Sequence, residues 1–584
     1  MKPRTRRHLR GGPHLRPIRV LALLAALVLP SWVLAATAGS ELHTHWAVEE
    51  GYSLRVLASG FSLPTSLAAV PHPAQQPQAP KLFVTELRGV IKAVANDDSV
   101  SEFDRIQTLT PRKEWPDWEG EAGMAGICLD PEHGYIFATY AYRDAAGVLR
   151  NGISRLRVEP HTFAGKVQER RDLGQFLARE PSALSHQIGN CVVHGGLLHV
   201  SIGDAGYPAQ SEKLDSPLGK VLRLTLDGEP APGNPFGGTG SIAPRVYVSG
   251  LRNPFGIGFA GDRLFAAENG IALDRFLELQ PGRNYQWNGS DGSIAINAAA
   301  VFVPTIGPAQ MVYAAPGTGG LRPSGHDRFL IAASNGRQGP GVVVLEHSRT
   351  DDSVVAAPRH LVRYEGHQVG MAVAGVALMA EGLAFAPILP VDGAGVVLVT
   401  RYEPAAAHDV VLGKADANPI AAKNCLGCHT LEGVGGHVGP SLDTNSLRTR
   451  IETRVLNSAY AQQLARLDHI DDPAVAQGRK ARQEVLAAAP DDRVSVWVVN
   501  RLLNPKFDQP DAQMPNLNLD RRTAEALARD LVGASGWRQR LAKVMSETRF
   551  VQGAALGGCA VAALAISLLA AWLVVRRFRV RARL

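Results

Sequence analysis

The chain has 584 residues, which is too long for a single hydrophobic core, so we expect two or three domains. Its composition, 45% hydrophobic and 20% charged, is that of a folded globular protein. The net charge of +7 comes from the two ends, because residues 1–19 carry seven Lys or Arg, residues 576–583 carry five, and neither segment has an acid. Subtracting these twelve charges leaves −5, which argues against a nucleic-acid-binding protein.

The chain begins with a predicted export signal. Basic residues are followed by an apolar run at 20–29 and by small residues that end in Ala-Thr-Ala at 36–38. This order is typical of a secretory signal peptide. We therefore predict a signal peptide at 1–38, with an uncleaved N-terminal anchor as the alternative.

Short β-strands of similar composition recur through residues 45–403. Each has bulky apolar residues that lead into small or hydroxylic ones, and successive copies are 54, 62, 66, 65 and 68 residues apart. Such spacing, with no long helical period between the strands, predicts an all-β six-bladed propeller; a β-sandwich is the alternative. The copies lie at 81–86, 135–140, 197–202, 263–268, 328–333 and 396–400.

Four stretches of this region, in order along the chain, resemble the PQQ-dependent glucose/sorbosone dehydrogenase family of exported sugar dehydrogenases. They are EAGMAGICLDPEHGYIFATY (121–140), SHQIGNCVVHGGLLHVSIGDAG (185–206), SGLRNPFGIGF (249–259) and AENGIALDRFLELQPGRNYQW (267–287). The resemblance covers most of 50–403 and weakens after about residue 300. It implies oxidation of a sugar, polyol or aldehyde with PQQ as cofactor.

The resemblance also implies a role for individual residues. His186 matches the catalytic base, and an imidazole suits proton abstraction near neutral pH. Arg252 matches the residue that faces the quinone carbonyl, where a fixed cation would stabilise developing negative charge. Further matches are Glu121, Asn253 and Thr305 as PQQ contacts, and the backbone carbonyls of Gly270 and Ile271 as ligands of a calcium ion.

Several of these residues are also compatible with simpler structural roles. His186 is also compatible with a hydrogen-bonded loop residue, Arg252 with an ion pair between blades, and Asp204 with a turn that caps backbone amides. His199, at a strand position, is expected to be structural.

The chain departs from the family at the residues that hold the three PQQ carboxylates. Strand alignment places the family's anchoring Lys at Asn335 and its arginine segment near Glu381, neither of which is basic. Arg337, Arg363 and Arg401 are the nearby candidates to replace them. The family's Arg after His-Gln-x-Gly is Asn190 here.

Cys128 and Cys191 both begin strands beside these stretches. Export permits a disulfide between them, but we expect buried free thiols.

Helical patterns replace the strands after a loose linker that follows Pro404. A small all-α domain is predicted at 408–535, with helices near 491–503 and 520–533 and a further helical insertion at 445–488. Its opening segment contains Cys425-Leu426-Gly427-Cys428-His429.

Three kinds of site use a Cys-x-x-Cys-His sequence. A zinc site would need a second pair of ligands, and the one later cysteine, Cys559, lies in an apolar segment. A thioredoxin-type redox pair would need a βαβ setting. A c-type haem needs two thiols for its vinyl groups and an adjacent histidine for its iron, which this spacing supplies.

Residues 408–535 therefore resemble a class I cytochrome c domain. Cys425 and Cys428 match the thioether positions, His429 the proximal iron ligand and Met514 the distal one. The segments GPSL (439–442) and LLNPK (502–506) resemble the family's haem-edge loop and its approach to the distal methionine. One covalent haem c is the implied cofactor.

The C-terminal end is predicted to cross a membrane. Residues 554–575 contain no charge over 22 positions, enough for a helix to span ~30 Å of hydrocarbon, and an arginine-rich tail at 576–584 follows. Because positive residues stay in the cytoplasm, the bulk of the chain is expected in the periplasm, anchored to the inner membrane.

Together these features predict a membrane-anchored quinohaemoprotein dehydrogenase. It would pass electrons from a sugar or alcohol through PQQ and haem to a membrane or periplasmic acceptor, such as a cytochrome or terminal oxidase. The alternative is an electron-transfer cytochrome whose non-catalytic propeller serves as a docking scaffold.

Overall fold

The computed structural model describes residues 45–533, apart from 109–120, 181, 239, 272, 291–297, 303–304, 335–337, 351–352, 356–357, 367–370, 389–394, 406–411, 413–419, 421–424, 436–438, 471–472, 511, 513 and 515–518. The chain divides into two compact units, Met1–Ala417 and Asn418–Leu584.

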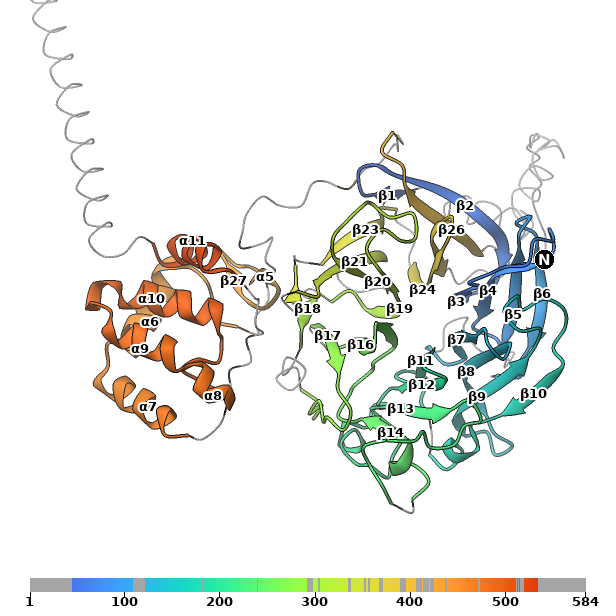
Figure 1. Cartoon of the computed structure of the whole chain (residues 1–584), viewed down its shortest axis with the longest axis horizontal. Coiled ribbons are helices and arrows are strands. Elements are labelled where there is room, and N and C mark those ends of the chain that lie inside the picture. The colour runs from blue at the N-terminus through green and yellow to red at the C-terminus, as the bar shows by residue number, and fades with distance from the viewer. Residues whose placement is uncertain are drawn as a thin grey trace, which may run out of the picture. The chain divides into compact units, whose positions relative to one another are not determined.

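The first unit is a ring of six antiparallel sheets (Figure 1). The first three blades are β3 (Pro64–Ala69), β4 (Pro80–Glu86), β5 (Val90–Ala95) and β6 (Val100–Arg105); β7 (Met124–Asp130), β8 (Tyr135–Arg143), β9 (Leu149–Arg157) and β10 (Glu169–Asp172); and β11 (Ile188–His194), β12 (Leu197–Ile202), β13 (Lys220–Thr225) and β14 (Val246–Val248). Three 3-10 helices lie among or between them, at η1 (Gln175–Leu177), η2 (Pro208–Gln210) and η3 (Ala243–Arg245).

The remaining three blades complete the ring. They are β15 (Gly256–Ala260), β16 (Arg263–Glu268), β17 (Asp274–Leu279) and β18 (Ala300–Phe302); β19 (Pro308–Ala314), β20 (Asp327–Ala333), β21 (Gly341–Ser348) and β23 (Arg359–Tyr364), with β22 (Ser353–Val354) beside β21; and β24 (Ala372–Met379), β25 (Gly382–Ile388) and β26 (Gly395–Tyr402). The innermost strands β3, β7, β11, β15, β19 and β24 pack one against the next, and β24 packs on β3. The predicted six-bladed propeller is confirmed.

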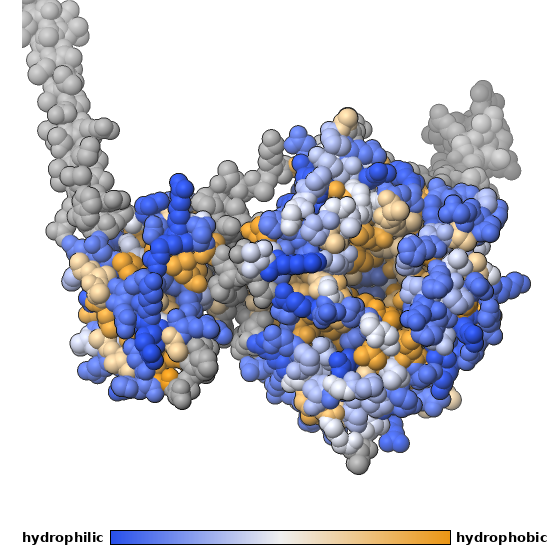
Figure 2. Space-filling model, viewed as in Figure 1, coloured by the Kyte–Doolittle hydropathy of each residue, from blue (hydrophilic) through white to orange (hydrophobic). Residues whose placement is uncertain are grey.

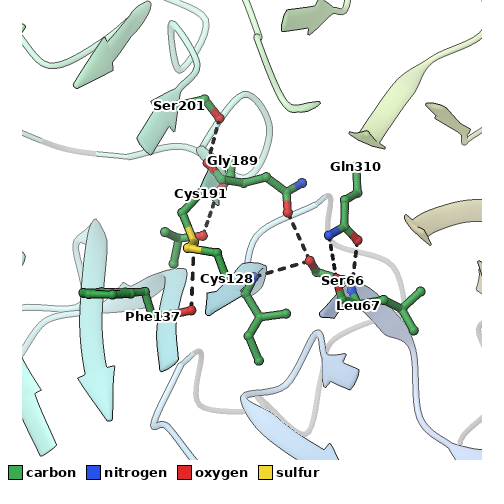
Figure 3. The surroundings of a disulfide bond; sticks show 11 residues. Ser66, Leu67, Cys128, Phe137, Gly189, Cys191, Ser201 and Gln310 are labelled. Carbon is green, nitrogen blue, oxygen red and sulfur yellow. Dashed lines mark hydrogen bonds between the residues drawn. A yellow bond between two sulfur atoms is a disulfide. The ribbon is translucent and has the colours of Figure 1, made fainter. Parts of the chain in front are cut away.

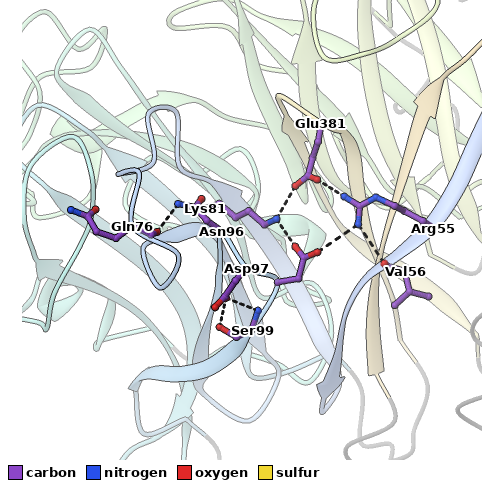
Figure 4. Close-up of polar contacts among 9 residues, drawn as sticks. Arg55, Val56, Gln76, Lys81, Asn96, Asp97, Ser99 and Glu381 are labelled. Atoms are coloured by element: carbon purple, nitrogen blue, oxygen red, sulfur yellow. Dashed lines mark hydrogen bonds and ion pairs between the residues drawn. The ribbon is translucent and has the colours of Figure 1, made fainter.

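The N-terminal strands close the ring. β2 (Tyr52–Phe61) pairs with β26 as the outermost strand of the sixth blade, and β1 (Trp46–Val48) adds to β23 at the edge of the fifth. Charged side chains reinforce this closure, since Lys81 of the first blade lies 3.1 Å from Glu381 of the sixth, and Glu381 also pairs with Arg55 (Figure 4). The first two described strands, β1 and β2, thus complete the fifth and sixth blades.

The strand repeat was correct for five blades and wrong for the sixth. The first five repeats are β4, β8, β12, β16 and β20, the second strand of each blade. The sixth, at 396–400, is β26, the third strand of its blade, whereas the second strand is β25. The sequence of β26 resembles the repeated pattern because β26 lies between β25 and β2 and is buried, and therefore apolar, along most of its length.

The blades pack through apolar side chains, and the ring keeps a hollow at its centre with apolar residues around it (Figure 2). Phe265 and Phe276 of the fourth blade, for example, each lie 4.8 Å, centroid to centroid, from Phe329 of the fifth. All three are buried, and burial of such a side chain stabilises the fold by about 1.5–3 kcal/mol.

Polar side chains link non-neighbouring blades inside the ring (Figure 3). The Ser66 hydroxyl of β3 donates to Asn190 Oδ1 of β11 at 3.0 Å. Gln310 of β19 exchanges two hydrogen bonds with the backbone of Leu67, at 2.9 and 2.7 Å. The inner strands are therefore tied together by hydrogen bonds as well as by packing.

A disulfide joins the innermost strands of the second and third blades. Cys128 on β7 and Cys191 on β11 are bonded, with their Cα atoms 5.7 Å apart (Figure 3). The expectation of two free thiols was therefore wrong. The two cysteines lie within neighbouring inner strands rather than at their starts, and the ring brings those strands side by side, which the sequence separation of 63 residues did not reveal.

The second unit is mostly helical around its own apolar core. A one-turn helix α5 (Cys425–Cys428) precedes the short strands β27 (Thr430–Leu431) and β28 (Val434–Gly435). The helices that follow are α6 (Thr444–Val455), α7 (Ser458–Asp468), α8 (Pro473–Gln477), α9 (Arg479–Ala487), α10 (Pro490–Leu503) and α11 (Arg521–Val532). The helices expected near 491–503 and 520–533, and the helical insertion at 445–488, are present.

Sequence signals explain the limits of α11. Asp520 caps its start by accepting a hydrogen bond from the Thr523 amide at 2.9 Å, and Gly533 follows its end with a φ of 78° that favours glycine. The apolar stripe of Ala524, Leu527 and Leu531 is buried. The helix thus packs on the core through the face that its periodicity predicted.

Across the described part of the chain, no helix has the length and apolar character needed to span a membrane. The predicted signal peptide at 1–38, membrane span at 554–575 and tail at 576–584 lie outside the described residues.

Candidate functional site

One end of the propeller collects most of the predicted site residues. Because neighbouring strands of a blade run antiparallel, the start of the first strand and the end of the second strand lie at the same end of the propeller. His186 precedes β11 and Asp204 follows β12, so both lie at this end of the third blade. The Arg252-Asn253 segment enters the fourth blade at the same end, and Gly270 follows β16 there.

His186 and Asp204 form a hydrogen-bonded pair. His186 Nδ1 lies 2.6 Å from Asp204 Oδ1, and the Ala205 amide donates back to the His186 carbonyl at 3.1 Å. His186 has a left-handed backbone with φ of 55°, unusual for a residue with a side chain. The imidazole is 19% exposed while the carboxylate is 1% exposed, so the ring is the member of the pair that reaches solvent.

Two further donors hold the Asp204 carboxylate. The Gly206 amide donates to Oδ1 at 2.9 Å, and the Trp287 indole Nε1 donates to Oδ2 at 2.7 Å. Burial by itself raises the pKa of Asp204, but these bonds and the one from His186 hold that pKa below its ordinary value. Asp204 is therefore an anion that fixes His186 in one orientation.

Arg252 is anchored by its backbone and leaves much of its guanidinium group available. Its amide donates to Glu268 Oε1 at 2.5 Å, and Glu268 in turn pairs with the fully buried Arg275. The side chain donates to the Asn269 carbonyl at 2.9 Å and lies 5.6 Å from the Trp287 ring centre. Arg252 forms no salt bridge with a carboxylate among the described residues.

The next residue, Asn253, is buried. It is 3% exposed, and its Oδ1 atom has no hydrogen-bond partner within the described structure. A methyl group added at Gly203 would lie 2.9 Å from that oxygen, so the glycine is needed for the close approach. An orphaned buried polar atom of this kind is suited to contact a ligand or water.

Asp274 joins two loops of the same end. Its carboxylate accepts the amide of Gly270 at 2.9 Å and those of Ile306 and Gly307 at 2.7 and 2.9 Å. Burial raises the pKa of Asp274 to about 6, against the opposing effect of these amides and of Arg252. The predicted calcium segment and the Thr305 loop are thus held together.

Glu121 lies beside the His186 segment. Its amide donates to the Leu184 carbonyl at 2.7 Å, and its carboxylate accepts from Ser185 at 3.2 Å. Its carbonyl accepts from Gln187, so the Glu-Ala-Gly turn and the His-Gln turn hold each other. The structure therefore brings Glu121 close to the pair formed by His186 and Asp204.

The described residues contain no group of three or more His, Cys, Asp or Glu side chains arranged to hold a metal. Calcium at Gly270 and Ile271 thus remains a prediction from two backbone carbonyls. Ile271 is 60% exposed, so this segment lies at the surface.

The structure corrects the predicted position of one anion anchor. Glu381 precedes β25 at the turn from β24, the end of the blade opposite the His186 end, because the sixth repeat was aligned to the wrong strand. Arg401 lies near that same far end on β26, and Arg363 lies on the outer strand β23 paired with Glu365 at 2.6 Å. Asn335 and Arg337 lie outside the described residues.

The second unit holds the other predicted site. His429 follows α5, and its Nδ1 lies 2.6 Å from the Pro440 carbonyl oxygen. A carbonyl can only accept, so Nδ1 carries the hydrogen and Nε2 is left with a lone pair for a metal. A Cβ added at Gly439 would lie 2.4 Å from the imidazole, so glycine is required beside the ring.

The remaining residues predicted for haem fit the same chemistry. Cys425 and Cys428 lie at the two ends of α5, and the His429 amide donates to the Cys425 carbonyl at 3.0 Å. Burial raises the pKa of Cys428 to about 11. Met514 and Cys425 both pack on the apolar core of this unit.

Comparison with known proteins bears on the propeller. Residues 68–303 match the family model described as "Glucose / Sorbosone dehydrogenase". The match supports the glucose/sorbosone dehydrogenase family for the propeller. It includes His186, Asp204, Arg252 and Gly270, and it ends before Thr305.

Parts of the chain are also similar in sequence to individual curated proteins. The chain is 26% identical over 197 residues to quinoprotein glucose dehydrogenase B of Acinetobacter calcoaceticus, covering 29% of this chain and 41% of that protein. It is 25% identical over 175 residues to an aldose sugar dehydrogenase of Escherichia coli (strain K12), covering 29% and 46%. The chain thus spans less than half the length of either curated relative.

A solved structure, the PQQ-bound form of aldose sugar dehydrogenase from Streptomyces coelicolor, aligns over 61% of this chain and 100% of its own, with 23% identity and a TM-score of 0.45.

Sequence reasoning missed three contributors to the site. Trp287 and Asp274 lie within one of the matching stretches but have no role predicted from the sequence, and Asp204 is predicted only as a turn residue. Their signal in the sequence is weak because each acts across a loop or a blade boundary, for example over the 83 positions from Asp204 to Trp287.

Proposed function

We propose that this protein is a PQQ-dependent dehydrogenase that oxidises a sugar, polyol or aldehyde at the His186 end of its propeller and passes the electrons to a haem c held by its helical unit. The observation that carries the proposal is the pair formed by His186 and Asp204 beside Arg252, which has no carboxylate partner among the described residues, on a propeller that matches the glucose/sorbosone dehydrogenase family.

His186 acts as the general base. Because Nδ1 donates its hydrogen to the Asp204 anion, Nε2 carries the lone pair that accepts a proton from the substrate hydroxyl. Asp204 stabilises the imidazolium ion that results. The low exposure of Asp204 keeps water from competing for this hydrogen bond.

Arg252 and Asn253 are the residues best suited to contact PQQ, and Glu121 and Thr305 are the further contacts that the family resemblance implies. PQQ, when bound, supplies a two-electron acceptor for the hydride. Arg252 has guanidinium hydrogens that could donate to an anionic group of the cofactor, and Asn253 offers a buried oxygen that has no hydrogen-bond partner in the part of the chain that the structure describes. A calcium ion on the carbonyls of Gly270 and Ile271 would complete the site that the resemblance implies.

The helical unit is proposed to hold haem c through Cys425, Cys428, His429 and Met514. The haem, when bound, supplies an iron that accepts one electron at a time. The hydrogen bond from His429 Nδ1 to the Pro440 carbonyl leaves the Nε2 lone pair available to bind iron, and a methionine thioether as a further ligand would raise the reduction potential.

Export and anchoring complete the proposal. The apolar segments at the two ends of the chain support a periplasmic location with a C-terminal membrane span, so that electrons leave to a membrane or periplasmic acceptor.

A second candidate function is an electron-transfer cytochrome with a non-catalytic propeller. It is favoured by the positions of Arg363 and Arg401, one paired on an outer strand and the other near the far end of its blade. Loss of charge-assisted bonds to three carboxylates would weaken PQQ binding by about 1.5–3 kcal/mol for each bond.

The deciding experiment follows the haem absorbance of the purified full chain. PQQ and Ca²⁺ are added, a panel of aldoses, polyols and aldehydes is offered, and haem reduction is recorded for the wild type and for His186→Gln. We expect reduction that requires PQQ and falls by roughly 10²–10⁴ in the variant. His194→Gln, an exposed histidine at the far end of β11, is the matched control and should keep wild-type activity.

Two results would contradict the proposal. Absence of PQQ binding in titration calorimetry, together with haem that stays oxidised with every substrate, would favour the scaffold. Equal loss in His186→Gln and His194→Gln would show that the effect is on folding.

A further inference from the structure

Lys220 is a fully buried cation that contacts no carboxylate in the described structure. It is the first residue of β13 in the third blade and is 0% exposed. Its Nζ atom donates to the backbone carbonyls of Ser211 at 2.6 Å, Leu218 at 2.7 Å and Gln210 at 3.1 Å. Three donors thus meet three acceptors, which satisfies an ammonium group completely.

All three carbonyls belong to the loop between β12 and β13, which carries Asp204 near its start. Gln210 and Ser211 lie in its first half and Leu218 at its end, so Lys220 gathers the loop around one atom. Lys220 itself pairs with Ile202 on the neighbouring strand, two residues before Asp204. The loop is therefore held from the strand that supports it.

The same loop is joined to the segment that carries Arg252. The Ser211 carbonyl also accepts the Gly250 amide at 2.7 Å, and the Gly219 carbonyl accepts the Leu251 amide at 3.1 Å. The Arg252 carbonyl accepts the Asp204 amide at 2.7 Å. A Cβ at Gly219 would lie 2.4 Å from the Leu251 carbonyl oxygen, which shows how closely these backbones approach.

The geometry points to a positioning role for Lys220: its ammonium group holds the loop after β12 so that Asp204 stays aligned with His186 and Arg252. The functional part of this inference rests on the proposed function, whereas the hold on the loop does not.

This hold depends on the charge of Lys220. Burial lowers the pKa of Lys220 to about 7, against the opposing effect of Asp215 and Glu212, the acids that act on it electrostatically and that lie on the same loop. Above that pH the amine keeps two hydrogens and turns a lone pair toward the third carbonyl. The loop should therefore loosen as the pH rises through neutrality.

The test measures amide hydrogen–deuterium exchange of the full chain, corrected for the intrinsic pH dependence of exchange. In Lys220→Met, which keeps the length but cannot donate, exchange over 204–219 should be about tenfold faster than in the wild type at pH 6. Lys213→Met is the matched control, because Lys213 is exposed on the same loop. It should leave exchange unchanged, and β3–β6 should stay equally protected in all proteins.

The pH dependence separates positioning from general stability. Protection of 204–219 in the wild type should fall between pH 6 and 8, and in Lys220→Arg it should not, because guanidinium stays charged. The PQQ-dependent turnover should show the same difference in its pH profile. Three results would each overturn the inference. They are unchanged exchange in Lys220→Met, equally accelerated exchange in all blades of that variant, and wild-type protection of 204–219 that does not change with pH. If hydrogen exchange changes as expected but none of the proteins shows PQQ-dependent turnover, the role of Lys220 in holding the loop is supported and the proposed function is rejected.

Discussion

Trp287 shows how one side chain from a distant segment shapes the site. Its indole reaches from the fourth blade to the buried carboxylate of Asp204 in the third, and its own amide donates to the Gly250 carbonyl at 2.9 Å. A carboxylate held on both oxygens has one orientation, which leaves Oδ1 directed at His186. We regard Trp287 as a positioning residue for that pair.

Replacement of Trp287 by Phe removes this donor while keeping an aromatic ring. We expect turnover to fall by roughly tenfold, because a charge-assisted hydrogen bond to a buried anion contributes about 1.5–3 kcal/mol. The measurement is kcat with PQQ and sugar, with circular dichroism to check folding. Tyr285→Phe is the control: it loses only hydroxyl hydrogen bonds, one from the Gln280 amide and one to the Glu278 carbonyl, in the same segment. An equal loss of turnover in both variants would mean that turnover depends on the packing of this segment and not on the hydrogen bond from Trp287 to Asp204.

His199 is the residue that should make the propeller sensitive to acid. It is 3% exposed, with its ring edge-on to Tyr247 and Phe259. Burial, with Arg223 and His194, lowers the pKa of His199 to about 3. Between that value and about 6.5 the unfolded chain binds a proton that the folded chain excludes, so stability falls as pH falls.

We therefore expect His199→Phe to lose less stability than the wild type on acidification. At pH 5 the neutral buried imidazole costs about 2 kcal/mol relative to neutral pH. Thermal unfolding midpoints at pH 7 and pH 5 measure the effect, and the exposed His72→Phe serves as control. An identical midpoint shift in wild type and His199→Phe would contradict the assignment.

At the scale of elements, the disulfide ties two inner strands that packing already brings together. Cys128 and Cys191 close a span of 63 residues, and a bridge over such a span stabilises the folded state by about 4 kcal/mol through the unfolded chain. β11, which carries Cys191, begins two residues after His186. The bridge therefore supports the strand from which the candidate base projects.

We expect the double variant Cys128→Ala, Cys191→Ala to lose about 2–4 kcal/mol of stability with little change in PQQ affinity. Urea unfolding under oxidising conditions measures this loss, and each single variant should match the double one. If addition of a reductant lowers the stability of the double variant as much as that of the wild type, the bridge is not the source of the effect.

At the scale of the whole molecule, closure of the ring depends on β2. The strand pairs with β26 from Tyr52 to Phe61, whereas the ion pairs of Lys81 and Glu381 lie at the partly exposed rim (Figure 4). Backbone pairing over a full strand should contribute far more than exposed ion pairs, which contribute about 0–1 kcal/mol each.

Lys81→Met should accordingly lower the unfolding midpoint only slightly, whereas removal of residues 45–61 should leave the sixth blade open and the propeller unable to fold. Near-ultraviolet circular dichroism and limited proteolysis of the two proteins measure the difference. A truncated chain with native spectra would show that the ring closes without β2.

The sequence by itself determined the periodic features. Strand repeats predicted the number of blades and placed the second strand of five of them, and capping residues predicted the limits of α11, because backbone conformation and burial follow from residue type and local spacing. The Cys-x-x-Cys-His spacing likewise predicts a haem-binding segment, since all its groups lie within five residues. These are properties that neighbours along the chain decide.

Tertiary structure decided which residues meet across blades. The partner of Cys128, the contacts of Asp204 with Trp287, and the position of Glu381 at the far end of its blade all depend on how strands are ordered around the ring. The sequence of β26 resembles that of the second strands of the other blades. Burial on both faces favours the same apolar residues in any strand, whether it is the second or the third of its blade. Contacts over such sequence distances leave no local signal, so only the folded ring reveals them.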